Sequence, residues 1–187
     1  TDYRRYHAMM IRQRFSIQFT GLDQTRPRRR CLETAVTAGV ATPIEAPAQL
    51  RQEMSALMSF KMATLTAIGF QRQGQWGEET ASQKVEHLGL MFGALAASPK
   101  GPVKGYGVPL GRLTFGLLVF PGVWDWYLQW RERRRGFYTR WEDDMLGVIL
   151  SLTRPETGWL WQHPELVRNV KPVAGLISAE EIAAAQK

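Results

Sequence analysis

The chain has 187 residues, 44% of them hydrophobic and 22% charged, which is the composition of one large or two small globular domains. Its single cysteine, Cys31, excludes a disulfide framework or a cysteine-rich zinc cluster built within the chain. A formal net charge of +7 and an isoelectric point near 9.9 favour a phosphate-bearing partner such as nucleic acid, although a basic protein without such a partner remains the alternative.

No signal peptide opens the sequence, and its longest apolar stretch, residues 113–123, is interrupted by Gly116, Pro121 and Gly122. We therefore expect a cytoplasmic protein with no membrane partner. The chain starts without methionine and ends inside a predicted helix that Ser178 opens with a capping box. These features lead us to expect a fragment of a longer protein.

Residues 1–44 form a predicted basic N-terminal segment. Its strongest positive cluster is the run Arg28, Arg29 and Arg30. Two interpretations of this run stay open, a solvated helix end and a clamp on phosphate groups. A linker rich in proline and alanine over residues 39–47 separates the segment from the rest of the chain.

Residues 45–175 form the predicted helical domain. Apolar residues three and four apart predict a helix over residues 48–70, whose methionine stripe belongs to the core. A capping box over residues 80–83 predicts a second helix, and residues 113–119 a shorter one. With seven or eight helices and no convincing sheet, we predict an all-α helical bundle, with residues 176–187 beginning a linker helix toward a further domain.

The most distinctive stretch is an aromatic and basic hairpin over residues 123–152. Its first helix should end at Gly136, and a capping box from Thr139 to Glu142 should open the second. The spacing of the tryptophans places them in the core. We expect function at the joint of this hairpin, where the sequence gathers Arg131, Arg133, Arg134, Arg135 and Arg140.

Nucleic-acid binding is the function that these features favour. A helix that enters the major groove reads bases with its first residues, while arginines and backbone N–H groups hold phosphates. The helix after residue 80 and the glycine- and proline-rich loop 98–109 add polar and basic groups to those of the hairpin. The predicted DNA-binding residues are Arg28, Arg29, Arg30, Ser82, Gln83, Lys84, His87, Lys100, Lys104, Arg131, Arg133, Arg134, Arg135 and Arg140.

The sequence contains no residue pattern that indicates catalysis or metal binding. The histidines His7, His87 and His163 are far apart, and none has a metal-ligand spacing with another ligand type. The acidic run Glu142–Asp144 suits the positive end of a helix better than general acid or base work. We therefore predict no metal, no cofactor and no catalytic residue in this chain.

The run from Thr80 to Leu88 with its long apolar continuation resembles the helical, SAM-like core-binding region that precedes the catalytic domain of tyrosine recombinases, the phage integrase family. The run from Trp126 to Thr139, in which tryptophan and arginines precede a glycine and a threonine-started helix, resembles the same region. The resemblance covers residues 45–170. It implies a clamp on duplex DNA at a recombination site, self-association on DNA, and a place with the bacterial nucleoid.

The chain lacks the motif on which the catalytic chemistry of that family depends. The family cleaves DNA with a tyrosine supported by arginines and a His-x-x-Arg motif, and none of the three histidines here is followed by arginine at that spacing. The resemblance thus implies a portion that is non-catalytic by itself. A helical protein–protein module whose basic surface binds an acidic partner is the competing hypothesis. If the chain binds DNA, we expect replacement of Arg133, Arg134 and Arg135 by alanine to weaken DNA binding and to leave the melting temperature nearly unchanged.

Overall fold

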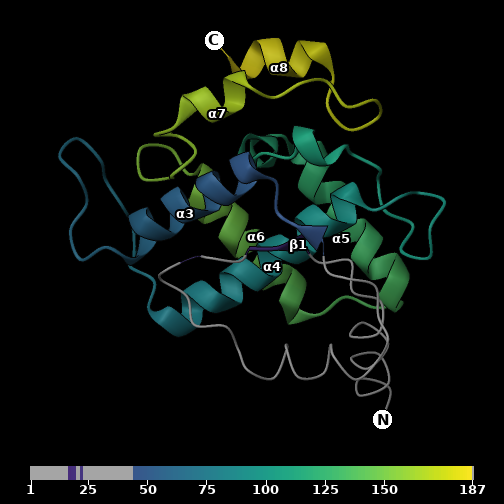
Figure 1. Cartoon of the computed structure of the whole chain (residues 1–187), viewed down its shortest axis with the longest axis horizontal. Helices are drawn as coiled ribbons and strands as arrows, with labels where there is room; N and C mark the ends of the chain where they lie inside the picture. The colour runs from purple at the N-terminus through teal and green to yellow at the C-terminus, as the bar shows by residue number, and fades with distance from the viewer. Residues whose placement is uncertain (1–16, 20–21, 23–43, 187) are drawn as a thin grey trace.

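The computed structural model describes residues 17–19, 22 and 44–186 (Figure 1). The predicted clamp at Arg28, Arg29 and Arg30 lies outside the described residues. Within them the elements in chain order are β1 (Ile17–Gln18), β2 (Ile44–Glu45), α3 (Ala48–Met62), α4 (Glu78–Ala96), η1 (Leu110–Arg112), η2 (Phe115–Val119), α5 (Pro121–Arg135), α6 (Arg140–Thr153), α7 (Pro164–Arg168) and α8 (Ala179–Ala185). Here η denotes a 3-10 helix.

Helices dominate the described part of the chain, which confirms the all-α prediction at the level of fold class. The six α-helices there are fewer than the seven or eight that the sequence predicts. The only sheet among these residues is one short parallel pairing, in which Ile17 lies opposite Ile44.

The core lies around η2, which packs against α5, α6 and α7. Its Phe115 is fully buried and meets Phe92 of α4 and Trp159 edge-on, with ring centroids 5.1 and 5.6 Å away. Glu53 of α3 fixes the start of η2, because its buried carboxylate accepts hydrogen bonds from the Thr114 hydroxyl and the Phe115 amide. The C-terminal helices α7 and α8 lie across one end of the molecule (Figure 1).

The α5–α6 hairpin forms as the sequence predicts. Pro121 occupies the first turn of α5, and Gly136 ends the helix with a left-handed backbone at φ +82°. The side chains of Thr139 and Glu142 cap each other's backbone at the start of α6. The capping box predicted at Ser178 is present too, at the start of α8.

The helix predicted over residues 48–70 is wrong beyond Met62. Ala63 turns the backbone to an extended conformation, and Leu65 is 83% exposed instead of continuing the apolar face. The guanidinium of Arg72 donates hydrogen bonds to the carbonyl groups of Phe60 and Ala63 at 2.7 and 2.6 Å. A side chain from outside the helix thus satisfies its last carbonyls, which periodicity within the helix could not indicate.

The capping box predicted at residues 80–83 is also wrong. Helix α4 starts at Glu78 after Gly77, so Thr80 lies within its first turn and caps nothing. The short helix predicted over residues 113–119 is present as the 3-10 helix η2. The methionine stripe is confirmed as core, since Met54 and Met58 are buried.

Candidate nucleic-acid interface

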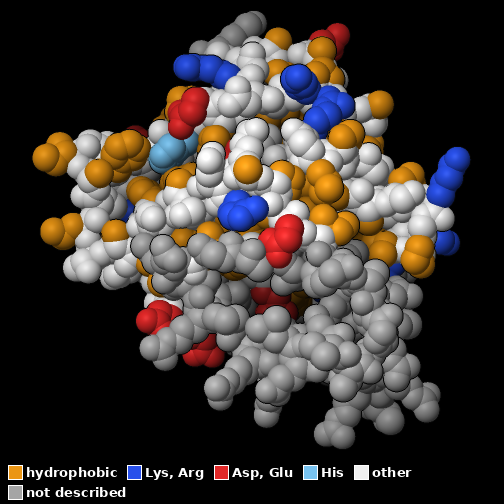
Figure 2. Space-filling model, viewed as in Figure 1, with side chains coloured by type: hydrophobic (Ala, Val, Ile, Leu, Met, Phe, Trp, Pro, Cys, Tyr) orange, Lys and Arg blue, Asp and Glu red, His pale blue; other side chains and the backbone are white. Residues whose placement is uncertain are grey.

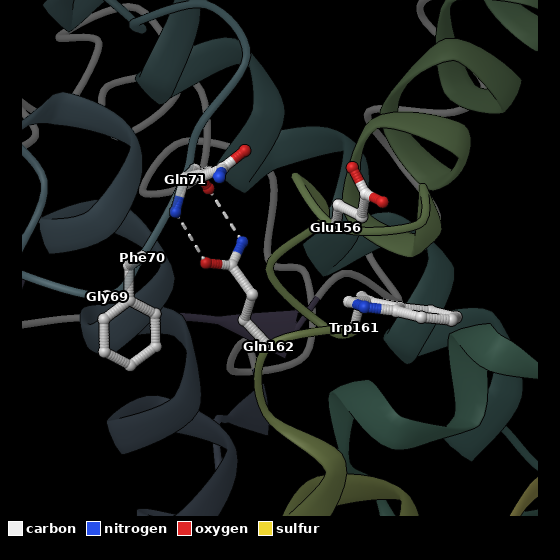
Figure 3. Close-up of a pocket in the computed structure, with 6 residues that line it drawn as sticks. All are labelled: Gly69, Phe70, Gln71, Glu156, Trp161 and Gln162. Atoms are coloured by element: carbon white, nitrogen blue, oxygen red, sulfur yellow. Dashed lines mark hydrogen bonds between the residues drawn. The ribbon is translucent and has the colours of Figure 1, made fainter.

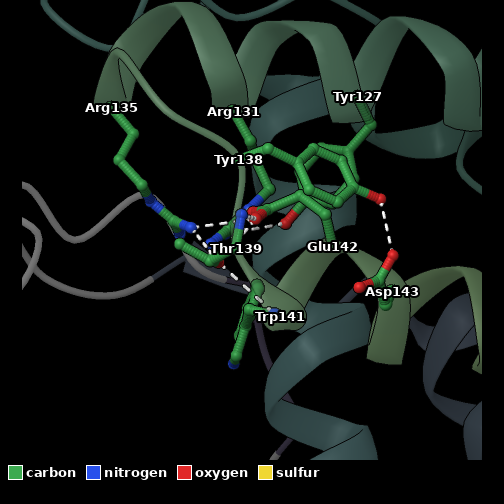
Figure 4. Close-up of polar contacts among 8 residues, drawn as sticks. All are labelled: Tyr127, Arg131, Arg135, Tyr138, Thr139, Trp141, Glu142 and Asp143. Atoms are coloured by element: carbon green, nitrogen blue, oxygen red, sulfur yellow. Dashed lines mark hydrogen bonds and ion pairs between the residues drawn. The ribbon is translucent and has the colours of Figure 1, made fainter.

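The joint between α5 and α6 is built around one buried carboxylate (Figure 4). Glu142 is fully buried, and its two oxygens form ion pairs with Arg131 and Arg135 at 2.7 and 2.9 Å. The same carboxylate accepts hydrogen bonds from the backbone amide and the hydroxyl of Thr139 at 2.8 and 2.6 Å. Two of the arginines expected at a DNA surface therefore hold the hairpin together.

Burial and hydrogen bonding act in opposite directions on the pKa of Glu142. Burial alone would raise it, but the hydrogen bonds from Thr139 and Arg131 and the positive charge of Arg131 outweigh that effect and lower the pKa. The carboxylate therefore stays ionised at neutral pH. The hairpin keeps a buried charge pair whose members depend on each other.

Trp141 contacts both a cation and a histidine. The guanidinium of Arg131 lies 3.7 Å from the Trp141 ring centroid, and the His87 ring lies 4.0 Å from it. Burial, then the nearby charges of Lys84 and Arg131, lowers the pKa of His87 to about 4. The ring is 2% exposed and its Nδ1 atom has no hydrogen-bond partner within the described part of the chain.

Near-complete burial excludes Arg131 and His87 from the predicted interface. Arg131 and His87 are 3% and 2% exposed, so neither side chain can reach a base edge or a phosphate in this conformation. Both side chains contact Trp141, through which α6 packs against α4 and α5. The prediction of a basic DNA-facing run at this joint is therefore wrong at its first arginine, which points inward.

The glycine- and proline-rich loop 98–109 is fastened to the end of α5. The indole N–H of Trp130 donates to the Lys104 carbonyl at 2.8 Å, and Arg134 donates to the Val103 carbonyl at 2.9 Å. The guanidinium of Arg134 also lies 4.9 Å from the Trp130 ring centroid. Arg134 is therefore half-buried and structural, while the loop is held against the joint.

Exposed cations lie on the fastened loop and on both helices of the hairpin. Lys100 and Lys104 of the loop are exposed, as are Arg133 near the end of α5 and Arg140 at the start of α6. We call these four residues the basic surface. Lys and Arg side chains project at the right edge of the view in Figure 2, on the side where Figure 1 draws this loop.

The predicted base-reading residues of α4 are less favourably placed. Ser82, Gln83 and Lys84 are half-buried. Because α4 starts at Glu78, they also lie beyond the first turn, and that turn carries the carboxylates of Glu78 and Glu79 instead. Negative charge at the helix start opposes a phosphate there. The basic surface is therefore the better candidate for contact with nucleic acid.

The role of Glu142 at this joint is the feature that sequence reasoning missed. Its place in a capping box was predicted, but its pairing with Arg131 and Arg135 joins residues eleven and seven positions apart. An antiparallel hairpin brings the last turn of one helix beside the first turn of the next. The usable signal was a carboxylate in that first turn opposite a basic last turn.

Two further findings concern metal ions and membranes. Among the described residues, no three histidine, cysteine or acidic side chains are grouped to hold a metal ion. Across the same residues, no helix has both the length and the apolar character of a membrane span.

Comparison with known proteins yields no match. Neither a family model, nor a curated protein, nor a solved structure matches the chain at a significant level.

Proposed function

We propose that this chain is the DNA-binding portion of a site-specific recombinase or integrase-like protein, with a SAM-like helical core, that clamps duplex DNA and is non-catalytic by itself. The observation that carries the proposal is the fastening of loop 98–109 to α5, which holds the backbone of Lys104 against the last turns of the helix that carries Arg133. Exposed cations held by a rigid support suit the phosphate backbone, because they are positioned before the DNA arrives.

The contacts assigned to DNA are those of the basic surface. Arg133 and Arg140 can each offer a forked pair of donors to a phosphate, while the two lysines act as point charges. Arg131 and Arg135 support these contacts indirectly by holding the joint through Glu142. Loss of an exposed cation should therefore change affinity, and loss of a paired arginine should change stability.

The test is a titration of the chain with duplex DNA over a range of salt concentrations. A phosphate-driven complex weakens linearly in a plot of log affinity against log salt, with a slope of about −0.9 for each phosphate contact. Replacing Lys100, Lys104, Arg133 and Arg140 by alanine should flatten the slope by about 3 to 4 and leave the melting temperature nearly unchanged.

A matched control removes the same charge elsewhere. Arg51, Arg154, Arg168 and Lys171 are also exposed and lie outside the basic surface. Their replacement by alanine should alter the slope much less, since only general attraction is lost. Equal effects of the two quadruple variants would contradict a defined interface, and no binding at low salt would favour the competing module that binds an acidic protein partner.

The recombinase part of the proposal has a separate test. The reading frame that encodes this chain should continue into a segment that carries the arginines, the His-x-x-Arg motif and the tyrosine of the family's catalytic domain. A frame without that set would leave DNA binding standing and remove the recombinase assignment.

A further inference from the structure

A pocket lies between the loop after α3 and the turn after α6 (Figure 3). Its volume is about 420 Å³, and it is lined by Gly69, Phe70, Gln71, Glu156, Trp161 and Gln162. This size falls within the range of small-ligand sites. In Figure 1 the loop after α3 and loop 98–109 lie at opposite sides of the molecule, so the pocket is separate from the basic surface.

The walls of the pocket are held in place by contacts between its two segments. The side-chain amide of Gln162 accepts from the backbone N–H of Gln71 at 2.9 Å and donates to its carbonyl at 2.7 Å. The Phe70 ring stacks on His163, with centroids 5.6 Å apart, and His163 Nδ1 lies 2.7 Å from the Trp159 carbonyl oxygen. The segments are thus joined before any ligand binds, which lowers the entropic cost of binding.

The lining combines two aromatic rings with one carboxylate. Phe70 and Trp161 are 37% and 59% exposed although most large apolar side chains of the described chain are buried. The carboxylate of Glu156 has no ion pair within the described residues, and no lysine or arginine lines the pocket. Glu156 has a left-handed backbone at φ +65°, which is unfavourable for a residue with a side chain.

We propose that this pocket binds an organic cation, either an alkylammonium or a guanidinium group. The faces of aromatic rings attract cations, and a carboxylate beside them adds charge neutralisation. An anion would meet the repulsion of Glu156. A purely apolar ligand would bury the Glu156 carboxylate without compensation.

Two sources could supply such a group, a free amine or a basic side chain of a protein. Leu65 and Ile68, on the same loop as Phe70, are 83% and 104% exposed. Hydrophobic side chains project at the left edge of Figure 2, on the side where Figure 1 draws this loop. They could contact the flanks of a protein segment but would add nothing for a small free cation.

The experiment monitors the indole N–H signal of Trp161 by nuclear magnetic resonance, and the Trp161→Leu variant assigns that signal among the seven tryptophans. The probes are choline, methylguanidinium, and the neutral alcohol in which a tert-butyl group replaces the trimethylammonium of choline. The cations should shift the signal in a saturable way, and the neutral alcohol should bind about tenfold more weakly or not at all.

Variants test each wall of the pocket. Glu156→Gln and Phe70→Leu should each weaken cation binding by about tenfold, because they remove the charge and one aromatic face while keeping similar volume. Glu165→Gln, which removes an exposed carboxylate from α7, is the matched control and should leave binding unchanged. Absence of a shift with either cation, equal binding of the neutral alcohol, or indifference to Glu156→Gln would each overturn the proposal.

A short peptide with one arginine between apolar residues distinguishes the two sources. If the peptide binds more tightly than methylguanidinium, and a Leu65→Ser, Ile68→Ser double variant removes that advantage, the pocket takes a protein side chain. If the double variant binds peptide and free cation as the parent chain does, the pocket takes a free amine. Either result supports the cation site itself.

Discussion

At the scale of single residues, Glu142 has the largest expected effect on stability. We predict that Glu142→Gln destabilises the chain by about 3 to 5 kcal/mol, because it leaves the buried Arg131 and Arg135 guanidinium groups without a counter-charge. Glutamine can still accept the hydrogen bond from the backbone of Thr139, so the loss of stability reports the missing charge and not a missing helix cap. Urea denaturation of the variant against Glu132→Gln, an exposed acid on α5, checks this.

The pH dependence of that stability has a definite sign. Since the pKa of Glu142 is lower in the folded chain than its ordinary value of 4.5, its contribution is complete above pH 4.5 and declines as the pH falls through the folded pKa. The Glu142→Gln variant should lack this part of the acid transition. A variant as stable as Glu132→Gln would mean that the two arginines find other partners.

His87 gives a second prediction, at higher pH. Its pKa is about 4 in the folded chain against 6.5 for an ordinary histidine, so the unfolded chain takes up the proton first as the pH falls. Stability should therefore be complete above pH 6.5 and decline between pH 6.5 and 4, by roughly 3 kcal/mol in all. A His87→Phe variant, which keeps a ring against Trp141, should have a flatter profile over this window. Identical profiles would show that His87 does not control the decline.

At the scale of elements, the structure and the sequence prediction differ in where helix α4 starts. Gly77 is the residue before the helix, its backbone is ordinary at φ −75°, and an added side chain would meet nothing within 4 Å. We predict that Gly77→Ser stabilises the chain by about 0.5 to 1 kcal/mol through a side-chain cap and a less flexible unfolded state. Thermal unfolding measures the gain.

Thr80→Ala is the control for that prediction. If α4 began at Thr80, as the capping pattern suggested, the substitution would cost about 1 kcal/mol. In the structure Thr80 is an exposed residue of the first turn, so the cost should stay within about 0.5 kcal/mol. A larger loss would restore the sequence-based start of the helix.

What the sequence could predict depends on where each signal lies. Gly136 and the capping box at Thr139 act within a few residues, so the hairpin was predicted with nearly correct ends. The end of α3 depends on Arg72, which comes from outside the helix. The inward position of Arg131 depends on Trp141 of the next helix. Local patterns therefore gave the elements, while the division of the arginines into structural and exposed ones required the packed fold.

The tryptophans show the same limit at the candidate pocket. Helical spacing correctly placed Trp130 in the core, where it is 4% exposed, whereas Trp159, which is 1% exposed, lies in the turn after α6. Trp161 comes two residues after Trp159 in a turn rather than a helix, and it is 59% exposed. A rule based on helix faces does not apply there. For that reason the pocket could not be predicted from the sequence.

At the scale of the whole molecule, helix α7 packs closely against η2 at Gly116. A side-chain carbon at Gly116 of η2 would lie 2.3 Å from the carbonyl oxygen of Leu166 and 2.9 Å from a methyl carbon of Val170. Gly116→Ala should therefore force α7 away from the core and destabilise the chain by about 1 to 3 kcal/mol. Faster amide hydrogen exchange in α7 and α8 than elsewhere would locate the damage.

The same substitution at Gly147 should have the opposite sign. Gly147 lies exposed within α6, and an added side-chain carbon there meets nothing within 4 Å. Alanine favours a helix interior over glycine by about 1 kcal/mol, so Gly147→Ala should raise the midpoint of urea denaturation. Both variants add the same methyl group, so a loss confined to Gly116→Ala is attributable to the packing of η2 against α7. If both variants lowered stability equally, the cause would be a general response to added bulk and not the contact that joins the C-terminal helices to the core.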